Sequence, residues 1–186
     1  MNKPLLIVVT GSPASGKTTL AHILAGKINC PVISRDEFKE GYINTLNFSH
    51  AESDSSVDLH VYNTFFEAID LLISKGISII IEAAFQDKLW RPKLLSLSDK
   101  AALRIIICKT NPDLISVRFA NRLSNDPGRE KFHGDRSISL SKEKFTMLIE
   151  NYKPVTIDAS TLQVNTTESY DPNIEEIINF IKETTA

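Results

Sequence analysis

Hydrophobic residues gather along the chain in two kinds of pattern, and the two kinds alternate. The first kind is a short, unbroken apolar run, which is typical of a strand buried on both faces of a parallel sheet. Residues 5–9 have this pattern without a break, and residues 31–34, 77–81 and 103–108 have it with one polar residue each. Residues 162–165 are predicted as a weaker fifth strand. The second kind spaces apolar residues by three or four positions, which predicts a helix with one buried side. It follows the first run at Leu20, Ile23, Leu24 and Ile28.

The same helical spacing predicts further helices over residues 57–76, 87–97, 112–123, 141–152 and 172–181. Gly76 occupies the position of a C-terminal glycine, Asn111 and Ser141 precede their helices as N-caps, and Asp171 is expected to cap the last helix. Strands that alternate with helices predict an α/β domain with three layers and a parallel sheet. Because a chain of this length commonly forms one core, we expect a single domain over residues 1–186.

Two polar stretches interrupt the pattern. Residues 41–56 are weakly patterned, so they are expected to be flexible and to form part of a substrate pocket. Residues 128–139 are charged and contain glycines, which predicts a mobile lid over about residues 126–139. The residues that follow each strand of a parallel sheet meet at one edge, where ligands bind. Functional residues are therefore expected at that edge.

The first apolar run leads into residues 11–18, which fit G-x-x-x-x-G-K-[ST] at every fixed position. Glycines let successive backbone N–H groups converge on an anion, and the helix that follows adds its positive dipole end. Lys17 supplies a mobile charge for the terminal phosphates, and the Thr18 hydroxyl can ligate Mg²⁺. The alternative is an incidental Gly-Lys-Thr, which the strand and helix on either side disfavour. The predicted nucleoside triphosphate site consists of Gly11, Ser12, Pro13, Ala14, Ser15, Gly16, Lys17, Thr18 and Thr19.

Two carboxylates are candidates for chemistry beside the phosphates. Asp36 follows the second strand, where it would face the γ-phosphate and accept a proton from an attacking hydroxyl, or hold a water on Mg²⁺. Its alternative role is that of a helix cap. Glu82 ends the third strand and is a candidate for orienting Mg²⁺ or water, the alternative being a solvated strand end. The candidate metal-binding residues are Thr18, Asp36 and Glu82.

Three arginines are candidates for neutralising the transferring phosphoryl group. Arg118 and Arg122 lie one turn apart on the helix predicted after the fourth strand, and Arg129 lies in the predicted lid. An ordinary charged helix face is the alternative for each of them. Thr166 and Thr167 follow the fifth strand, where a loop would pass the adenine ring. Thr167 is therefore a further nucleotide-binding candidate.

Composition restricts the partners. The chain has 21 Lys and Arg and 23 Asp and Glu, with a formal net charge of −2, which argues against bulk binding of nucleic acid. The two cysteines stand in apolar contexts and are expected to be reduced core thiols. The four histidines have no ligand-like spacing, so no zinc site is predicted. Since neither a signal peptide nor an apolar run of about 20 residues is found, a cytoplasmic location without membrane contact is expected.

Taken together, the motif at residues 11–18, Ser34-Arg35-Asp36-Glu37, the acid after residues 77–81 and the three arginines resemble the P-loop kinases. The resemblance spans nearly the whole chain and is nearest to the branch of the zeta toxins, chloramphenicol phosphotransferase and the polynucleotide 5′-kinases. It implies a kinase-type P-loop NTPase fold with a five-stranded sheet in the order 2-3-1-4-5. It also implies ATP·Mg²⁺ as donor, Asp36 as base and lid arginines on the phosphates. Many relatives carry Asp with Thr or Asn after the third strand, where this chain has Glu82-Ala83-Ala84-Phe85-Gln86.

The expected function is that of an ATP-dependent kinase that phosphorylates a hydroxyl of a small molecule, such as a nucleoside, a sugar nucleotide or an antibiotic. One alternative is a zeta-type toxin acting on a sugar nucleotide, and another is an ATP-binding switch or ATPase that transfers nothing. The sequence contains no N-K-x-D guanine motif, so ATP is expected to be preferred over GTP. No pattern in the sequence identifies the acceptor or the oligomeric state.

Overall fold

A parallel five-stranded sheet forms the centre of the computed structural model, which describes residues 3–47, 55–133, 146–147 and 149–183. Its strands are β1 (Leu5–Gly11), β2 (Val32–Ser34), β3 (Ile79–Glu82), β4 (Ala102–Lys109) and β5 (Ser160–Asn165). Their order is β2-β3-β1-β4-β5, and every neighbouring pair is parallel. The predicted α/β class and the strand order implied by the P-loop kinases are therefore confirmed.

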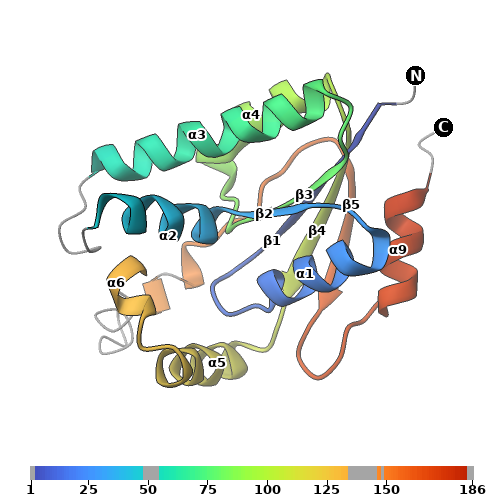
Figure 1. The fold of residues 1–186 in the computed structure, drawn as a ribbon. Helices are drawn as coiled ribbons and strands as arrows, with labels where there is room; N and C mark the ends of the chain where they lie inside the picture. The colour runs from blue at the N-terminus through green and yellow to red at the C-terminus, as the bar shows by residue number, and fades with distance from the viewer. Residues whose placement is uncertain (1–2, 48–54, 134–145, 148, 184–186) are drawn as a thin grey trace.

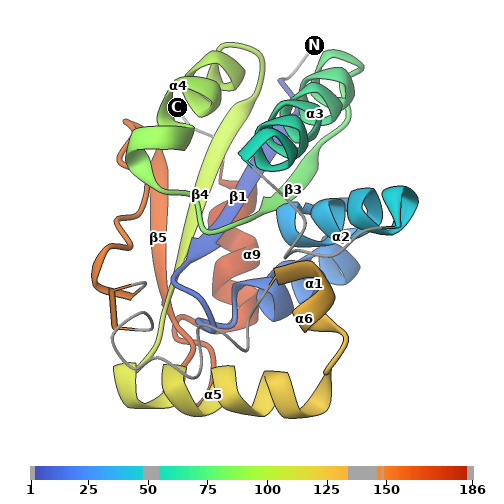
Figure 2. The ribbon, with the colours of Figure 1, turned by 90° about the vertical axis from the view of Figure 1, so that its left-hand side faces the viewer.

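Helices cover both faces of this sheet (Figures 1 and 2). On one face lie α3 (Ser55–Ser74) and α4 (Asp87–Ser98), and on the other lie α1 (Lys17–Ile28) and α9 (Ile174–Lys182). Next to the ends of the strands lie α2 (Arg35–Leu46), α5 (Pro112–Asn125) and α6 (Arg129–His133). The carboxyl edge of the sheet is thus enclosed by α1, α2, α5 and α6, and this is where the site lies.

Alternate residues of the central strand build two separate hydrophobic cores. Leu6 and Val8 of β1 pack with the α3 and α4 side, whereas Ile7 and Val9 pack with the α1 and α9 side. All four side chains are fully buried. A strand buried on both faces needs apolar residues at every position, which explains the unbroken run in the sequence.

The polar stretch that follows β2 is more regular than its sequence suggests. Residues 41–46, expected to be flexible, continue α2 to Leu46, so this expectation is wrong there. The helix is stabilised by tertiary contacts, since Ile43 is fully buried and the Phe38 ring meets the Phe65 ring of α3 edge-on, with centroids 6.1 Å apart. Residues 48–54 of that stretch lie outside the described residues, and residues 55 and 56 begin α3.

Two of the helix ends predicted from the sequence are confirmed, and one is wrong. Gly76 adopts φ 76° after α3, and the Asn111 side chain accepts a hydrogen bond from the Asp113 amide at the start of α5, as predicted. Asp171 does not cap α9. Asn173 does, because its side chain accepts from the amides of Glu175 and Glu176, while the backbone of Asp171 pairs with Asn165 next to β5.

The predicted lid is described only in its first part. Residues 129–133 form the short helix α6, and residues 134–139 lie outside the described residues, as does Ser141, the predicted cap of the following helix. Within the described part of the chain, no helix is both long and apolar enough to cross a membrane.

Candidate nucleotide site

The loop between β1 and α1 has the backbone that an anion-binding turn requires. A Cβ added at Gly11 would lie 2.3 Å from Ser15 Oγ and 2.7 Å from the carbonyl oxygen of Cys108, so only glycine fits. Ala14 and Gly16 adopt left-handed conformations, with φ 58° and 81°, and α1 begins directly after Gly16. Such left-handed residues next to a helix N-terminus are typical of loops whose amides gather around a phosphate.

A buried chain of polar groups lies beneath this loop. Lys17 Nζ lies 3.6 Å from Glu82 Oε1, and Ser34 Oγ donates a hydrogen bond of 2.7 Å to Glu82 Oε2. Only 7% of Lys17 and 2% of Glu82 are exposed. Glu82 is therefore no solvated strand end, because its carboxylate joins the phosphate-loop lysine to the last residue of β2.

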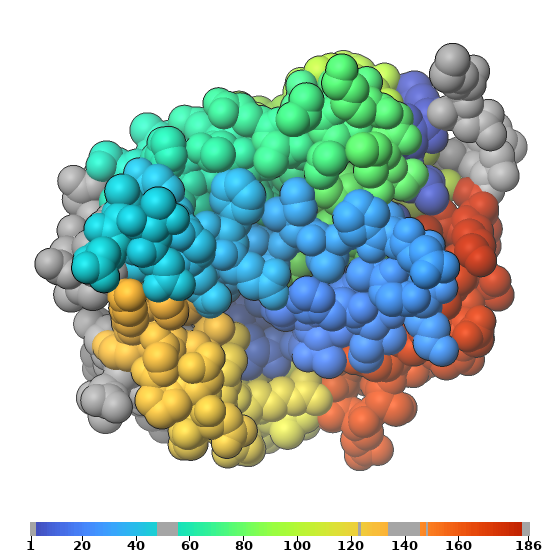
Figure 3. All heavy atoms as spheres, viewed as in Figure 1, coloured from blue at the N-terminus to red at the C-terminus, as the bar shows by residue number. Residues whose placement is uncertain are grey.

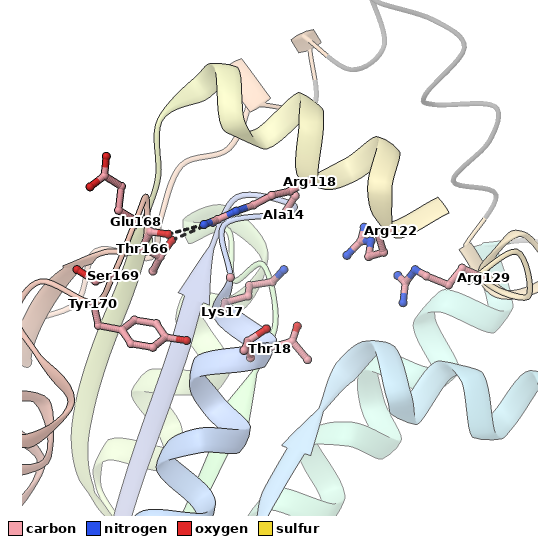
Figure 4. Close-up of a pocket in the computed structure, with 12 residues that line it drawn as sticks. Ala14, Lys17, Thr18, Arg118, Arg122, Arg129, Thr166, Glu168, Ser169 and Tyr170 are labelled. Atoms are coloured by element: carbon pink, nitrogen blue, oxygen red, sulfur yellow. Dashed lines mark hydrogen bonds between the residues drawn. The ribbon is translucent and has the colours of Figure 1, made fainter. Parts of the chain in front are cut away.

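A pocket of about 490 Å³ opens above the loop (Figure 4). In Figure 4 the guanidinium groups of Arg122 and Arg129 lie on the side of the pocket toward which the Lys17 side chain extends. In the space-filling view, dark-blue atoms of the N-terminal segment are visible between α1 and the yellow and gold surface of α5 and α6 (Figure 3). The residues lining the pocket are Ala14, Gly16, Lys17, Thr18, Thr19, Arg118, Arg122, Arg129, Thr166, Glu168, Ser169 and Tyr170.

Arg118 lines the same pocket but is bound to its wall. Its Nη2 donates to the carbonyl oxygens of Thr166 (2.6 Å) and Thr167 (3.0 Å), the two residues after β5. The guanidinium group thus holds the segment expected beside the adenine ring. Arg122 and Arg129 differ from Arg118, because they line both this pocket and the one beside Asp36.

Thr166 follows β5 as the sequence predicts, but it was not chosen there as a nucleotide-binding residue, and the structure gives it a structural role in the site. Its buried hydroxyl donates to the Ser15 carbonyl (2.7 Å), and its amide donates to the Lys109 carbonyl (2.8 Å). The residue thereby joins the phosphate loop to the ends of β4 and β5. Thr167, the residue predicted to bind nucleotide, is placed differently. It lines a neighbouring hollow, where its Oγ1 accepts a hydrogen bond from the Asn111 amide (3.2 Å).

A second pocket, of about 260 Å³, adjoins the first beside the start of α2. Its residues are Pro13, Lys17, Arg35, Asp36, Lys39, Ala84, Phe119, Arg122, Arg129 and His133. Burial disfavours the charged form of Asp36, but the positive charges of Lys17, His133, Arg35 and Arg129 outweigh this effect and lower its pKa below the ordinary value of 3.8. Asp36 is therefore an ionised carboxylate at neutral pH, within the field of the phosphate-loop lysine.

Contacts from α6 to α2 enclose this second pocket. His133 Nε2 lies 2.7 Å and Arg129 Nη1 3.6 Å from the same oxygen, Oε1 of Glu40. Lys131 donates a hydrogen bond to the Asn44 side chain (3.1 Å). Because these contacts join residues about 90 positions apart, the sequence offered no signal for Glu40.

The oxygen groups at the site suit Mg²⁺, which prefers hard oxygen ligands and retains several waters. Thr18 lines the nucleotide pocket. Asp36 lines the adjoining pocket together with Lys17, and the Glu82 carboxylate forms an ion pair with Lys17. Both Glu82 oxygens have protein partners, so this carboxylate fits a role through metal-bound water better than direct ligation. Among the residues that the structure describes, no group of three or more His, Cys, Asp or Glu residues could hold a metal ion by itself.

Comparisons with known proteins agree with this site. A family model described as an AAA domain matches residues 6–166, and the chain belongs to this family of P-loop proteins. A protein of Thermococcus kodakarensis named "Putative adenylate kinase" is 24% identical over 180 residues, which cover 96% of this chain and 86% of the relative.

Solved structures extend the likeness. One from Chloroflexus aurantiacus, described as "a putative kinase", has a TM-score of 0.84 and 25% identity, with 100% of both chains covered. The APS kinase of Mycobacterium tuberculosis in complex with AMPPNP and APS has a TM-score of 0.64 over 98% of this chain and 100% of its own. Its 13% identity shows the fold alone. Fold, site and family together define a nucleotide-binding protein of the P-loop kinase type.

Proposed function

We propose that this protein is an ATP-dependent kinase that transfers the γ-phosphate to a hydroxyl group of a small molecule, and that residues 1–186 act as one domain. One observation carries the proposal. Lys17, Arg122 and Arg129 border both the pocket above the phosphate loop and the pocket beside Asp36. A donor phosphate in the first pocket and an acceptor in the second would therefore meet at the same three positive charges.

The residues where the two pockets meet have different roles in the proposed transfer. Loop amides and Lys17 hold the terminal phosphates, and Arg122 and Arg129 neutralise the charge on the transferring group. The acceptor oxygen forms a bond to the γ-phosphorus while the bond from that phosphorus to the ADP oxygen breaks. Asp36, being ionised, takes up the hydroxyl proton. Mg²⁺, held by Thr18 and by waters next to Asp36 and Glu82, would add positive charge at the phosphates.

Similar proteins include kinases, which supports a kinase activity and leaves the acceptor open. The relative from Thermococcus has the name "Putative adenylate kinase", and the APS kinase was solved in complex with AMPPNP and APS. We propose that the protein lies near the zeta toxins, chloramphenicol phosphotransferase and the polynucleotide 5′-kinases, because residues 34–37, at the end of β2 and the start of α2, resemble that branch. Action on a sugar nucleotide in the manner of a zeta toxin is then one outcome of an acceptor screen.

The test is transfer of radioactive phosphate from [γ-³²P]ATP to a panel of nucleosides, sugars, sugar acids, sugar nucleotides and aminocyclitols. We expect labelled product with at least one acceptor, and a loss of labelling in Lys17→Ala, whose circular dichroism should match that of the wild type. ATP hydrolysis without any labelled acceptor would favour the ATPase or switch instead.

A further inference from the structure

The pocket beside Asp36 contains more positive charge than phosphoryl transfer requires. Lys17, Arg122 and Arg129 are shared with the nucleotide pocket, but Arg35 and Lys39 line the Asp36 pocket without lining the nucleotide pocket. Among the described residues that line the Asp36 pocket, Asp36 is the one with a carboxylate. Two cations thus line only the pocket on the proposed acceptor side.

Arg35 and Lys39 are four positions apart on α2, so they project from the same face of the helix. Arg35 Nη2 and Lys39 Nζ donate to the same atom, Oδ1 of Asp58 in α3, at 2.9 Å and 3.0 Å. Burial raises the pKa of Asp58, but the two cations outweigh this and lower it. With Asp36, whose Oδ1 lies 3.6 Å from Arg35 Nη1, this group has two positive and two negative charges. Lys17, Arg122 and Arg129 line the same pocket and make its lining positive as a whole.

A tie between α2 and α3 does not explain this arrangement. Either cation alone could join Asp58 to α2, and Asp58 itself is half exposed. Lys39 is only 4% exposed. Its ammonium group has three N–H donors, and among the described residues it has one hydrogen-bond acceptor, Oδ1 of Asp58. Burying an ammonium group with so few partners is unfavourable, and a ligand anion would supply what is missing.

We propose that the acceptor is a small hydroxyl compound that carries a carboxylate or a phosphate, and that Arg35 and Lys39 bind this anionic group. The inference rests on the proposed kinase function and specifies its substrate class. Arg35 is the neighbour of Asp36, and its Nη1 lies 3.6 Å from Asp36 Oδ1. The anion and the reacting hydroxyl are therefore expected close together in the acceptor, as in a hydroxy acid or a polyol phosphate.

Binding is tested first, with the nucleotide pocket filled by AMPPNP and Mg²⁺ so that phosphate compounds cannot occupy the phosphate loop. Two series are titrated by calorimetry: glycerol, glycerate and glycerol 3-phosphate, and glucose, gluconate and glucose 6-phosphate. At least one anion should bind about 10- to 100-fold more tightly than its neutral counterpart, which is the range for a charge-assisted contact. The preferred member of the series shows whether the site takes carboxylate or phosphate.

Lys39→Met should abolish this preference, because it keeps the length of the side chain and removes its charge. Lys100→Met is the matched control, since Lys100 donates to a single aspartate, Asp70 (2.6 Å), outside both pockets. Affinity for AMPPNP shows that each variant is folded. If Lys39→Met does not fold, Arg35→Gln provides the same test from a more exposed position. No anion preference in the wild type, or an unchanged preference in the variants, overturns the inference.

Phosphate transfer to the same compounds separates this inference from the kinase function. Labelling of an anionic acceptor, with a KM that rises at least about 10-fold in Lys39→Met and a smaller change in kcat, supports both. Equal labelling of neutral and anionic compounds confirms a kinase and overturns the anion site. Lys39-dependent anion binding without labelling of any compound keeps the anion site and removes the kinase assignment.

Discussion

Lys17 Nζ and Glu82 Oε1 lie 3.6 Å apart, and both side chains are buried beneath the phosphate loop. Nucleotide phosphates would have to attract the lysine away from this carboxylate, or share it. Glu82 is fixed in turn by the Ser34 hydroxyl at the end of β2. The carboxylate therefore competes with a bound phosphate for Lys17, and in the proposed function it would also orient a water on Mg²⁺.

Replacing Glu82 with Gln separates these two effects. In the presence of EDTA, Glu82→Gln should bind ADP several-fold more tightly, because Lys17 loses its competing partner. With Mg²⁺, turnover should fall about 10- to 100-fold, as expected when an outer partner of a metal is lost. Calorimetry and steady-state kinetics measure the two quantities. Glu37→Gln is the control, since Glu37 forms an exposed pair with His22; weaker ADP binding in Glu82→Gln would contradict the competition.

Asp36→Asn tests the proposed base. The asparagine keeps the shape of the side chain. Asp36 lies in the first turn of α2, whose N-cap is Ser34, and the asparagine loses only the attraction to the surrounding positive charges, so the melting temperature should fall modestly. Turnover should fall about 10²–10⁴-fold, because the proton acceptor is lost, while ATP affinity is nearly retained. Measurement at two Mg²⁺ concentrations distinguishes the roles, since recovery at high Mg²⁺ would assign Asp36 to the metal. Wild-type turnover would refute both roles.

The lowered pKa of Asp36 predicts how the rate depends on pH. Burial raises this pKa, but the charges of Lys17, His133, Arg35 and Arg129 reduce it below 3.8 in the folded protein. A carboxylate with a depressed pKa stays ionised until the pH falls through that value, and its stabilising contribution is lost only there. The ratio of wild-type to Asp36→Asn turnover should thus be constant between about pH 5 and pH 8. A ratio that falls with decreasing pH in this range would show that the pKa is raised.

Thr166→Val tests whether the end of β5 supports the phosphate loop. Loss of the hydroxyl leaves the Ser15 carbonyl without its side-chain donor, which should reduce the free energy of unfolding by about 1–3 kcal/mol. AMPPNP affinity should also fall, since the loop loses a fixed point. Thr161→Val is the matched control, because Thr161 lies in β5, just before Thr166, and its exposed hydroxyl donates to the Ala159 carbonyl (2.9 Å). Urea unfolding and calorimetry give both values; equal effects at the two positions would contradict the role.

Local sequence was sufficient for the strands and the phosphate loop, because a doubly buried strand needs an unbroken apolar run and the loop needs Gly11 for steric reasons. It was insufficient for contacts between distant segments. Thr166 bonds to Ser15 across 151 positions, and Glu40 meets His133 across 93. The helix over residues 41–46 was missed for the same reason, since the burial of Ile43 arises only when α2 packs against α3.

The last prediction concerns α6 and its arginine. Arg129 lies over both pockets and is held near Glu40 of α2, so a bound triphosphate would offer it a stronger partner. AMPPNP with Mg²⁺ should therefore slow amide exchange in residues 129–133 of the wild type. In Arg129→Gln this protection should be lost and turnover should fall about 100-fold or more, because a charge on the transferring group is no longer neutralised. Arg91→Gln is the control, as Arg91 forms an exposed pair with Asp87 on α4. Equal exchange with and without the analogue in the wild type would show that α6 does not respond to nucleotide, and the assignment of this segment as a lid would fall.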